Sequence, residues 1–229
     1  MTTLIFDLDD TLLDFTASEE KGLTGVFADF GIPDNADTRA TYKRVNSGLW
    51  AALERGELTR AQLLDVRFAR FGAAIAKHDF DAHAAEKEYR NFLNNGFDRV
   101  PGAKTLLTNL QQRGYRILAG TNGNAATQHN RLLHSHLSPL FDGVYISEEI
   151  GYDKPDPRFF DAIFAAEPHI DRNDTIMIGD GLNSDIRGGV DYHLPTIWVN
   201  RKHQVNKTEL HPTHTVTDLQ QLSDLLLNA

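Results

Sequence analysis

The 229-residue sequence contains no cysteine. This absence excludes catalysis by a thiol, zinc sites built on cysteine, and disulfide scaffolds. Long apolar runs are also missing, since no stretch of the chain approaches the roughly 20 residues that a transmembrane helix needs. The first residues include neither a basic region nor a long apolar segment. We therefore expect no membrane span, no signal peptide, and a cytoplasmic location.

Positive charge is in short supply as well. Asp and Glu number 32 against 23 Lys and Arg, which gives a formal net charge of −9. An acidic surface repels the phosphate backbones of DNA and RNA, so we expect no nucleic acid polymer as a partner. A small anionic ligand is compatible with this charge if a local cation offsets it. With 41% apolar residues, the chain has the composition of a globular protein, and we expect a monomer or a weak homodimer.

The order of the predicted elements divides the chain into two parts. Residues 3–6 form a short apolar run that ends in acids, which predicts a buried strand opening onto a loop. From residue 16 to 96 apolar side chains recur at helical spacing, with capping boxes predicted at Thr16–Glu19 and Thr59–Gln62. Further on, predicted strands (116–120, 143–146, 175–179, 196–199) alternate with predicted helices (103–112, 125–134, 157–166, a short one near 185, 218–227).

This alternation predicts the α/β class, with a Rossmann-like parallel sheet covered by helices on both faces. The sheet core would consist of residues 1–15 and 97–229. An all-helical domain, residues 16–96, would be inserted after the first strand.

Two carboxylates, Asp7 and Asp9, directly follow the first predicted strand. Two such charges ~4 Å apart repel by ~4 kcal/mol at an effective dielectric of 20, so a cation or a proton must relieve them. A metal-bound carboxylate can act as a nucleophile while its neighbour serves as general acid. Alternatively, Asp9, Asp10 and Thr11 cap the next helix, and this segment alone does not distinguish the two interpretations.

Three further segments also follow predicted strands, where open parallel sheets bind ligands. Thr121 and Asn122 could offer a hydroxyl and backbone N–H groups to an anion, or simply form a turn. Lys154 precedes Pro155, which biases its backbone toward an extended conformation; a solvated surface lysine is the alternative.

The last of these segments begins at Gly179-Asp180-Gly181 and approaches the dinucleotide fingerprint G-x-G-x-x-G. Ser184 replaces the third glycine, and no acid follows at the ~20-residue spacing expected of a ribose partner. A dinucleotide site is therefore disfavoured. Asp180 and Asp185 instead suit a hard cation held by carboxylate oxygens.

Taken in order, Asp7-x-Asp9-x-Thr11, Thr121, Lys154 and Gly179-Asp180…Asp185 resemble the four motifs of the haloacid dehalogenase superfamily, specifically its phosphatases. The resemblance implies that Asp7 is the nucleophile and becomes transiently phosphorylated. It implies that Asp9 protonates the leaving oxygen and then activates water. It also implies Mg²⁺ as cofactor, held by Asp7, the backbone carbonyl of Asp9, and Asp180, with Asp185 as a ligand or a support behind the ligands.

The same resemblance assigns phosphate binding to Thr121, Asn122 and Lys154, and makes the helical insertion a mobile cap that excludes water. The chain has Gly181 at a position where many superfamily members have serine. Any contact made by that serine side chain is therefore absent here.

A finer resemblance is to the YjjG-like pyrimidine 5′-nucleotidases. This resemblance rests on six segments: Leu12-Leu13-Asp14-Phe15, Asn46-x-x-Leu49-Trp50, Thr59-Arg60, Arg67-Phe68, Thr121-Asn122-Gly123 and residues 147–152 (Ser-Glu-Glu-Ile-Gly-Tyr). It implies a small phosphorylated metabolite as substrate, namely a pyrimidine nucleoside 5′-monophosphate. Asn46 and Arg67 are candidate substrate contacts in the cap, although a solvated helix face would explain either residue alone.

Other functions compete with this one. A phosphatase of sugar phosphates or other small metabolites, or a β-phosphoglucomutase-like mutase, would use the same two acids. Dehalogenases of the superfamily generally lack the second acid, so Asp9 argues against them. A phosphorylated receiver domain would be about half this length. Zinc is not expected, because the histidine pairs His134/His136 and His211/His214 have no third ligand at a convincing spacing.

Overall fold

The computed structural model describes residues 1–228, without the side chain of Glu54. The chain divides into two compact units. One is discontinuous and comprises Met1–Phe15 together with the chain from Phe97 onward; we call it the α/β unit. The other comprises Thr16–Gly96, and we call it the helical unit.

The α/β unit is built on a parallel sheet, which within residues 1–228 has six strands in the order β3-β2-β1-β4-β5-β6. This is the strand order of the doubly wound nucleotide-binding folds. The central strand β1 lies between β2 and β4, where the chain reverses its direction of winding. The strands are β1 (Thr3–Phe6), β2 (Arg116–Thr121), β3 (Gly143–Ile146), β4 (Thr175–Gly179), β5 (Thr196–Val199) and β6 (His214–Val216).

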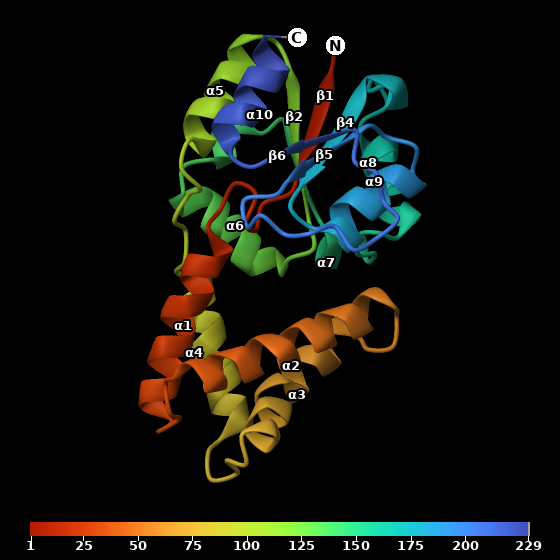
Figure 1. Ribbon diagram of the computed structural model, residues 1–229. Coiled ribbons are helices and arrows are strands. Elements are labelled where there is room, and N and C mark those ends of the chain that lie inside the picture. The colour runs from red at the N-terminus through yellow and green to blue at the C-terminus, as the bar shows by residue number, and fades with distance from the viewer. Residues whose placement is uncertain (229) are drawn as a thin grey trace. The chain divides into compact units, whose positions relative to one another are not determined.

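Helices cover both faces of this sheet (Figure 1). Successive side chains of a strand point to opposite faces of the sheet. In β1 the side chains on both faces are apolar. Leu4 and Phe6 pack into one core cluster, with α5 (Ala103–Gln112), α6 (Ala125–His134) and α10 (Leu219–Leu227). Ile5 packs into the other, with α8 (Pro157–Ala166) and with Tyr192 and Leu194, which follow α9 (Arg187–Asp191). The predicted α/β class with a parallel sheet is therefore confirmed.

Shorter elements connect these layers. Helix α7 (Ser147–Ile150) follows β3, and a π-helical turn (Leu182–Ile186) follows β4. Single 3-10 turns occupy Ser138–Leu140 and Arg172–Asp174. Neither α7 nor β6 was predicted. Both are too short for a periodic apolar pattern, and β6 is an edge strand in which only Val216 is buried.

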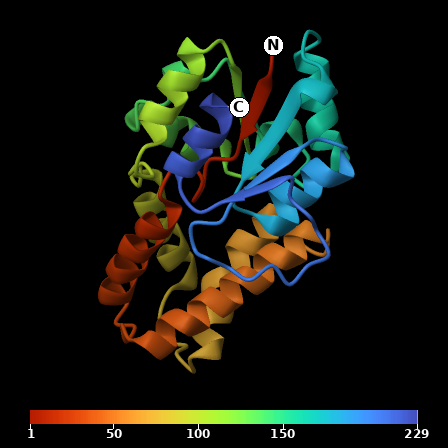
Figure 2. The same ribbon diagram turned by 45° about the horizontal axis from the view of Figure 1, so that its top comes forward.

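The helical unit is made up of α1 (Phe15–Asp29, whose first residue belongs to the α/β unit), α2 (Ala36–Glu54), α3 (Arg60–Ala74) and α4 (Ala82–Asn94), seen in Figure 2. The capping box at Thr59 and Gln62 is present as predicted. The cap predicted at Thr16 is wrong, because α1 begins one residue earlier and Thr16 lies inside it. An aromatic cluster fills the centre, made of Phe27, Tyr42, Phe68, Phe71 and Tyr89, with ring centroids 5.5–6.1 Å apart.

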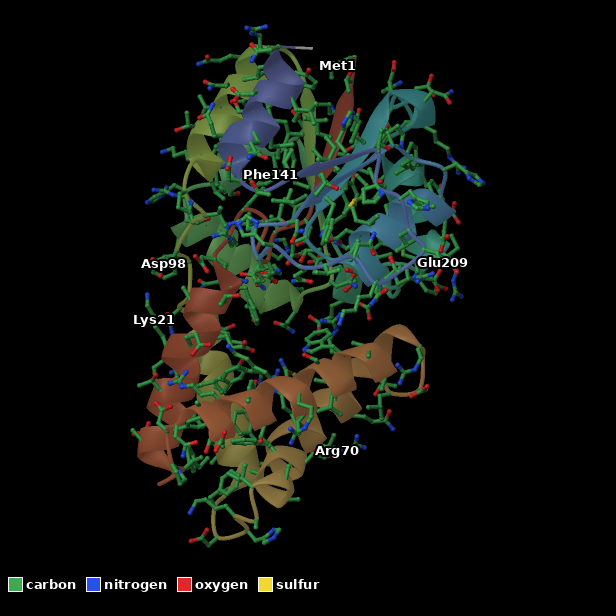
Figure 3. All side chains as sticks on the ribbon, in the orientation of Figure 1. Met1, Lys21, Arg70, Asp98, Phe141 and Glu209 are labelled. Carbon is green, nitrogen blue, oxygen red and sulfur yellow. The ribbon has the colours of Figure 1, made fainter. Side chains whose placement is uncertain are left out.

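Charged side chains lie mainly at the surface, as the labelled residues Lys21, Arg70, Asp98 and Glu209 illustrate (Figure 3). None of the helices within residues 1–228 is at once long and apolar enough to cross a bilayer.

Candidate active site

The carboxyl end of the sheet carries the residues singled out in the sequence. Asp7 directly follows β1, and its N–H donates to Ile178 O of β4 at 2.8 Å. Thr121 is the last residue of β2, and Asp180 follows β4. Because all strands run parallel, these ends meet at one edge, and Lys154 reaches the same edge from the loop after α7.

Lys154 joins two of the predicted acids. Its Nζ lies 2.9 Å from Asp7 Oδ1 and 2.7 Å from Asp185 Oδ1, and it also donates to Gly120 O at 2.5 Å. Lys154 is 1% exposed, Asp185 2% and Asp7 7%. A buried ammonium is stabilised only when such anionic and carbonyl oxygens surround it. The alternative of a solvated surface lysine is thereby excluded.

A third acid completes the cluster. Oxygens of Asp7, Asp180 and Asp185 all lie within 4.8 Å of one another. Gly181 N–H donates to Asp185 Oδ2 at 2.9 Å and so fixes this carboxylate. Trp198 Nε1–H donates to the backbone carbonyl of Asp180 at 2.9 Å and anchors the loop. Carboxylate oxygens at this spacing are the donor set that Mg²⁺ and Ca²⁺ prefer.

Two acids of this cluster, Asp7 and Asp180, are hard to ionise without a cation. Burial, together with the charges of Asp185 and Asp9, raises the pKa of Asp7 to about 7, against the lowering effect of Lys154. Burial and the charges of Asp7 and Asp185 raise the pKa of Asp180 well above its ordinary value. One lysine thus leaves the three acids undercompensated, and a divalent cation would relieve them. The cluster therefore fits the predicted metal.

Glycine 179 is required for this geometry. A Cβ at Gly179 would lie 2.1 Å from Asp185 Oδ2, well inside the closest approach of such atoms. At Gly181, a Cβ would lie 2.2 Å from Ser184 Oγ. The backbone of the loop after β4 therefore passes directly against the Asp185 carboxylate.

Asn122 does not direct its amide to open space. Its Nδ2 donates to Lys154 O at 2.7 Å, and its Oδ1 accepts from Lys154 N–H, also at 2.7 Å. The side chain thereby pairs with the backbone of Lys154 as a neighbouring strand would. In this geometry Asn122 positions the lysine, and its predicted phosphate contact is left to its backbone N–H group.

Thr121 and Asp9 are joined through a residue that the sequence did not single out. Gln128 Nε2 donates to Thr121 Oγ1 and to Asp9 Oδ2, both at 2.8 Å. Arg131 forms an ion pair with Asp9 Oδ1. Both new residues belong to α6, three positions apart, and both are 1% exposed.

No simple pattern in the sequence marks Gln128 and Arg131. In α6 the arginine is buried whereas Leu133 is 62% exposed, the reverse of what an apolar stripe predicts. Lys202 was missed as well; its Nζ donates to Asp10 Oδ2 at 2.7 Å. Asp10 has a φ of +59°, a conformation that Asp tolerates better than most residues.

The two candidate substrate contacts of the helical unit lie together. Arg67 Nη1 donates to Asn46 Oδ1 at 3.3 Å, and the guanidinium pairs with Glu86 at 2.6 and 2.9 Å. Arg67 is 2% exposed, so its interpretation as a solvated charge is wrong. Asn46 is partly buried and donates to Glu19 Oε1 at 3.4 Å.

The sequence is similar to those of known proteins over nearly the whole length of the chain. The family model of haloacid dehalogenase-like hydrolases matches residues 1–192. The putative HAD-hydrolase YfnB of Bacillus subtilis is 38% identical, covering 98% of this chain and 94% of its own. The pyrimidine 5′-nucleotidases PynA of Streptococcus pneumoniae and YjjG of Escherichia coli are 36% and 32% identical; the alignments cover 97% of this chain and 94% and 96% of theirs.

The fold is similarly matched. The crystal structure of YfnB bound to magnesium superposes with a TM-score of 0.91 at 38% identity, covering 100% of this chain and 99% of the other. An L-2-haloacid dehalogenase from Xanthobacter autotrophicus reaches a TM-score of 0.76 at 13% identity, covering 99% and 98%. At that identity the second likeness concerns the fold alone.

Proposed function

Because the chain belongs to the haloacid dehalogenase-like hydrolases, we propose that it is a Mg²⁺-dependent phosphomonoesterase acting through a phosphorylated Asp7. The family and the hydrolase class predicted from the sequence are confirmed by this membership. The single observation that carries the mechanism is the buried contact of Asp7 with Lys154 beside the carboxylates of Asp180 and Asp185. A carboxylate nucleophile, a cationic phosphate ligand and a metal site are thereby within reach of one reacting group.

In the first half of the proposed reaction, an Asp7 carboxylate oxygen attacks phosphorus. The bond from phosphorus to the leaving oxygen breaks, and Asp9 donates its proton to that oxygen. In the second half, Asp9 takes a proton from water, the water oxygen attacks phosphorus, and the bond to Asp7 breaks. The sum is hydrolysis of a phosphate monoester to an alcohol and inorganic phosphate.

Holding the phosphoryl group falls to Lys154 and Thr121. The Lys154 ammonium already contacts Asp7, so a phosphoryl group transferred to Asp7 would meet a positive charge at once. Thr121 Oγ1 accepts from Gln128, and a hydroxyl that accepts such a bond keeps its own hydrogen for donation to an anion. Both residues thus act through position and charge, which phosphoryl transfer mainly requires.

The proposed metal ligands are Asp7, Asp180 and the Asp9 backbone carbonyl, with Asp185 either as a ligand or as a support. When bound, Mg²⁺ would neutralise charge on the transferring phosphoryl oxygens and on the acids. Asp185 pairs with Lys154 through Oδ1 and accepts from Gly181 N–H through Oδ2. Both oxygens are therefore engaged by protein groups, which favours the supporting role for Asp185.

For the substrate we propose pyrimidine nucleoside 5′-monophosphates, supported by the names of PynA and YjjG. The helical unit, residues 16–96, is proposed as the cap that selects the leaving group. Asn46 and Arg67 are its proposed contacts. Because Arg67 is occupied by Glu86, we assign the direct contact to Asn46, with Arg67 holding the Asn46 amide in place.

The test is a panel of nucleoside monophosphates and sugar phosphates assayed with Mg²⁺ and with EDTA, ranked by kcat/KM. We expect UMP and dTMP to rank first, activity to require the metal, and Asp7→Asn to abolish both turnover and acid-stable labelling by ³²P substrate. Full activity in Asp7→Asn would refute the mechanism. Sugar phosphates ranking with UMP would refute the nucleotidase assignment alone, and isomer formation without phosphate release would indicate a mutase.

A further inference from the structure

Helix α6 holds both carboxylate oxygens of Asp9. Arg131 pairs with Oδ1, and Gln128 Nε2 donates to Oδ2 at 2.8 Å. The Asp9 side chain is 32% exposed, whereas Arg131 is 1% exposed. The carboxylate is therefore open to solvent on one side and fixed on the other by two side chains of one helix.

The amide of Gln128 engages three partners. Its Nε2 donates to Asp9 and to Thr121 Oγ1, each at 2.8 Å, and its Oε1 accepts from Arg131 Nη1 at 3.1 Å. A primary amide has two N–H donors and one carbonyl acceptor, so these bonds use each kind of group. The rotamer of Gln128 is thereby determined, and with it the separation between Asp9 and Thr121.

Packing fixes Gln128 further. A Cβ built on Gly123 would lie 2.3 Å from Gln128 Cγ. The loop after β2 thus leaves room for the glutamine only because residue 123 has no side chain. Since Gln128 is 1% exposed, it has little freedom to swing away from Asp9.

Arg131 contributes a buried positive charge. Burying a guanidinium is costly unless an anion and hydrogen-bond acceptors receive it, and Asp9 supplies the anion. The Phe15 ring lies 5.7 Å from Arg131 Cζ. Leu at position 131 would pack the core without this desolvation cost. The buried arginine is therefore better explained by its ion pair with Asp9 than by core packing.

We propose that Gln128 and Arg131 are positioning residues that hold the Asp9 carboxylate where it can exchange a proton with the leaving oxygen. The inference rests on the proposed phosphatase function. Its consequence is specific: loss of either side chain leaves Asp7 and its contact with Lys154 in place but misplaces the proton donor. The cost then depends on how much the leaving group needs that proton.

The experiment compares kcat/KM for two substrates, UMP and p-nitrophenyl phosphate. This ratio reports the steps through departure of the leaving group. Nitrophenolate departs without protonation, whereas the ribose 5′-oxygen needs a proton. For Gln128→Leu and for Arg131→Met we expect kcat/KM for UMP to fall about 10²-fold, the range in which general acids act, and that for p-nitrophenyl phosphate to fall less than about 5-fold.

Leu132→Ala provides the matched control. Leu132 is on the same helix, is 2% exposed and belongs to the apolar core cluster. We expect it to lower Tm at least as much as Gln128→Leu while lowering kcat/KM equally for both substrates. Asp9→Asn provides the reference, and in the double variant Asp9→Asn/Gln128→Leu the two losses should not multiply, because both act through one carboxylate.

Equal losses on both substrates in Gln128→Leu, or multiplying losses in the double variant, would overturn the positioning role. If Arg131→Met fails to fold, Gln128→Leu alone decides, since it replaces a neutral side chain of similar size. An unmodified protein with no Mg²⁺-dependent activity on either substrate would instead refute the proposed function itself, so the two failures are distinguishable.

Discussion

The side-chain amide of Asn122 makes two hydrogen bonds, each of 2.7 Å, to the backbone N–H and C=O of Lys154. These residues belong to loops that follow different strands, β2 and β3. The pair of bonds therefore ties together two loops at the carboxyl end of the sheet, and it sets where the Lys154 ammonium lies relative to Asp7.

Replacing Asn122 should therefore impair catalysis through Lys154. For Asn122→Leu we expect kcat/KM to fall about 10²-fold, the effect of a ~1 Å misplacement of a catalytic group. Asn122→Asp keeps the acceptor for Lys154 N–H but sets a carboxylate against Lys154 O, so it should be no better. Steady-state kinetics with Mg²⁺ would measure both. Activity within 2-fold of the unmodified enzyme in Asn122→Leu would contradict this positioning role.

A second prediction concerns the pH dependence of stability without metal. Burial raises the pKa of Asp7 from 3.8 to about 7, so folding disfavours its ionised form. The neutral Asp7 carboxyl group therefore contributes to the free energy of unfolding. This contribution is fully present below the unfolded-state pKa near 4 and is lost as pH rises through about 7.

Thermal unfolding in EDTA should accordingly show a Tm at pH 7.5 that is lower than at pH 5 by about 3 °C or more. Asp7→Asn has no such carboxyl group and should show a smaller difference between the two pH values. At the proposed metal site, Mg²⁺ would bind the ionised acids, and it should therefore raise Tm more at pH 7.5 than at pH 5. If Asp7→Asn shows the same Tm difference between pH 5 and pH 7.5, the pH dependence comes from groups other than Asp7.

Replacing Gly179 tests the proposed metal site, because an added Cβ changes the shape of the site without changing its charge. A Cβ there would lie 2.1 Å from Asp185 Oδ2, so Gly179→Ala must displace this carboxylate. We expect Mg²⁺ affinity, measured by calorimetry, to fall at least 10-fold. Gly48→Ala is the control, because nothing lies within 4 Å of a Cβ in that helical position, and it should stabilise the protein by about 0.5–1 kcal/mol.

The Arg67–Glu86 pair should dominate the stability of the helical unit. Both side chains are buried, 3% and 6% exposed. Arg67→Met therefore leaves the buried Glu86 carboxylate with only the longer contact to Arg90, at 3.6 Å, at a cost of about 3–5 kcal/mol. Urea unfolding would measure this, and the double variant Arg67→Met/Glu86→Leu should recover much of the loss. Arg55→Ala removes an exposed pair with Glu57 and should leave the urea midpoint nearly unchanged.

The sequence was sufficient to predict the limits of helices in which apolar residues recur at regular spacing. Helices α5, α6 and α8 begin and end at the predicted residues, because their apolar spacing and flanking Gly, Asn and Pro mark both limits. The acids to which we assign the chemistry could be placed at one sheet edge from the sequence, because they lie in segments that follow strands of a parallel sheet, whose ends necessarily meet.

The remaining contacts depend on atoms that sequence spacing does not specify. Nothing in the order Gln128, Arg131, Leu133 indicates that the charged side chain is buried and the leucine exposed, because that depends on the charge of Asp9 across the sheet edge. Likewise, Arg67 sits among aromatic residues only because Glu86 of another helix meets it there.

Strand β1 has a consequence for the order in which the chain can acquire structure during synthesis. Its partners begin at Arg116 and Thr175, and the entire helical unit is made before either. The nascent chain therefore carries Leu4, Ile5 and Phe6 unpaired while residues 16–96 can already fold. In stalled nascent chains that end before Arg116, we expect hydrogen exchange to show protected amides in α1–α4 and unprotected amides in β1; protection of β1 in such chains would contradict this order. Asp7, which directly follows β1, is thus made before the helical unit but reaches its place after it.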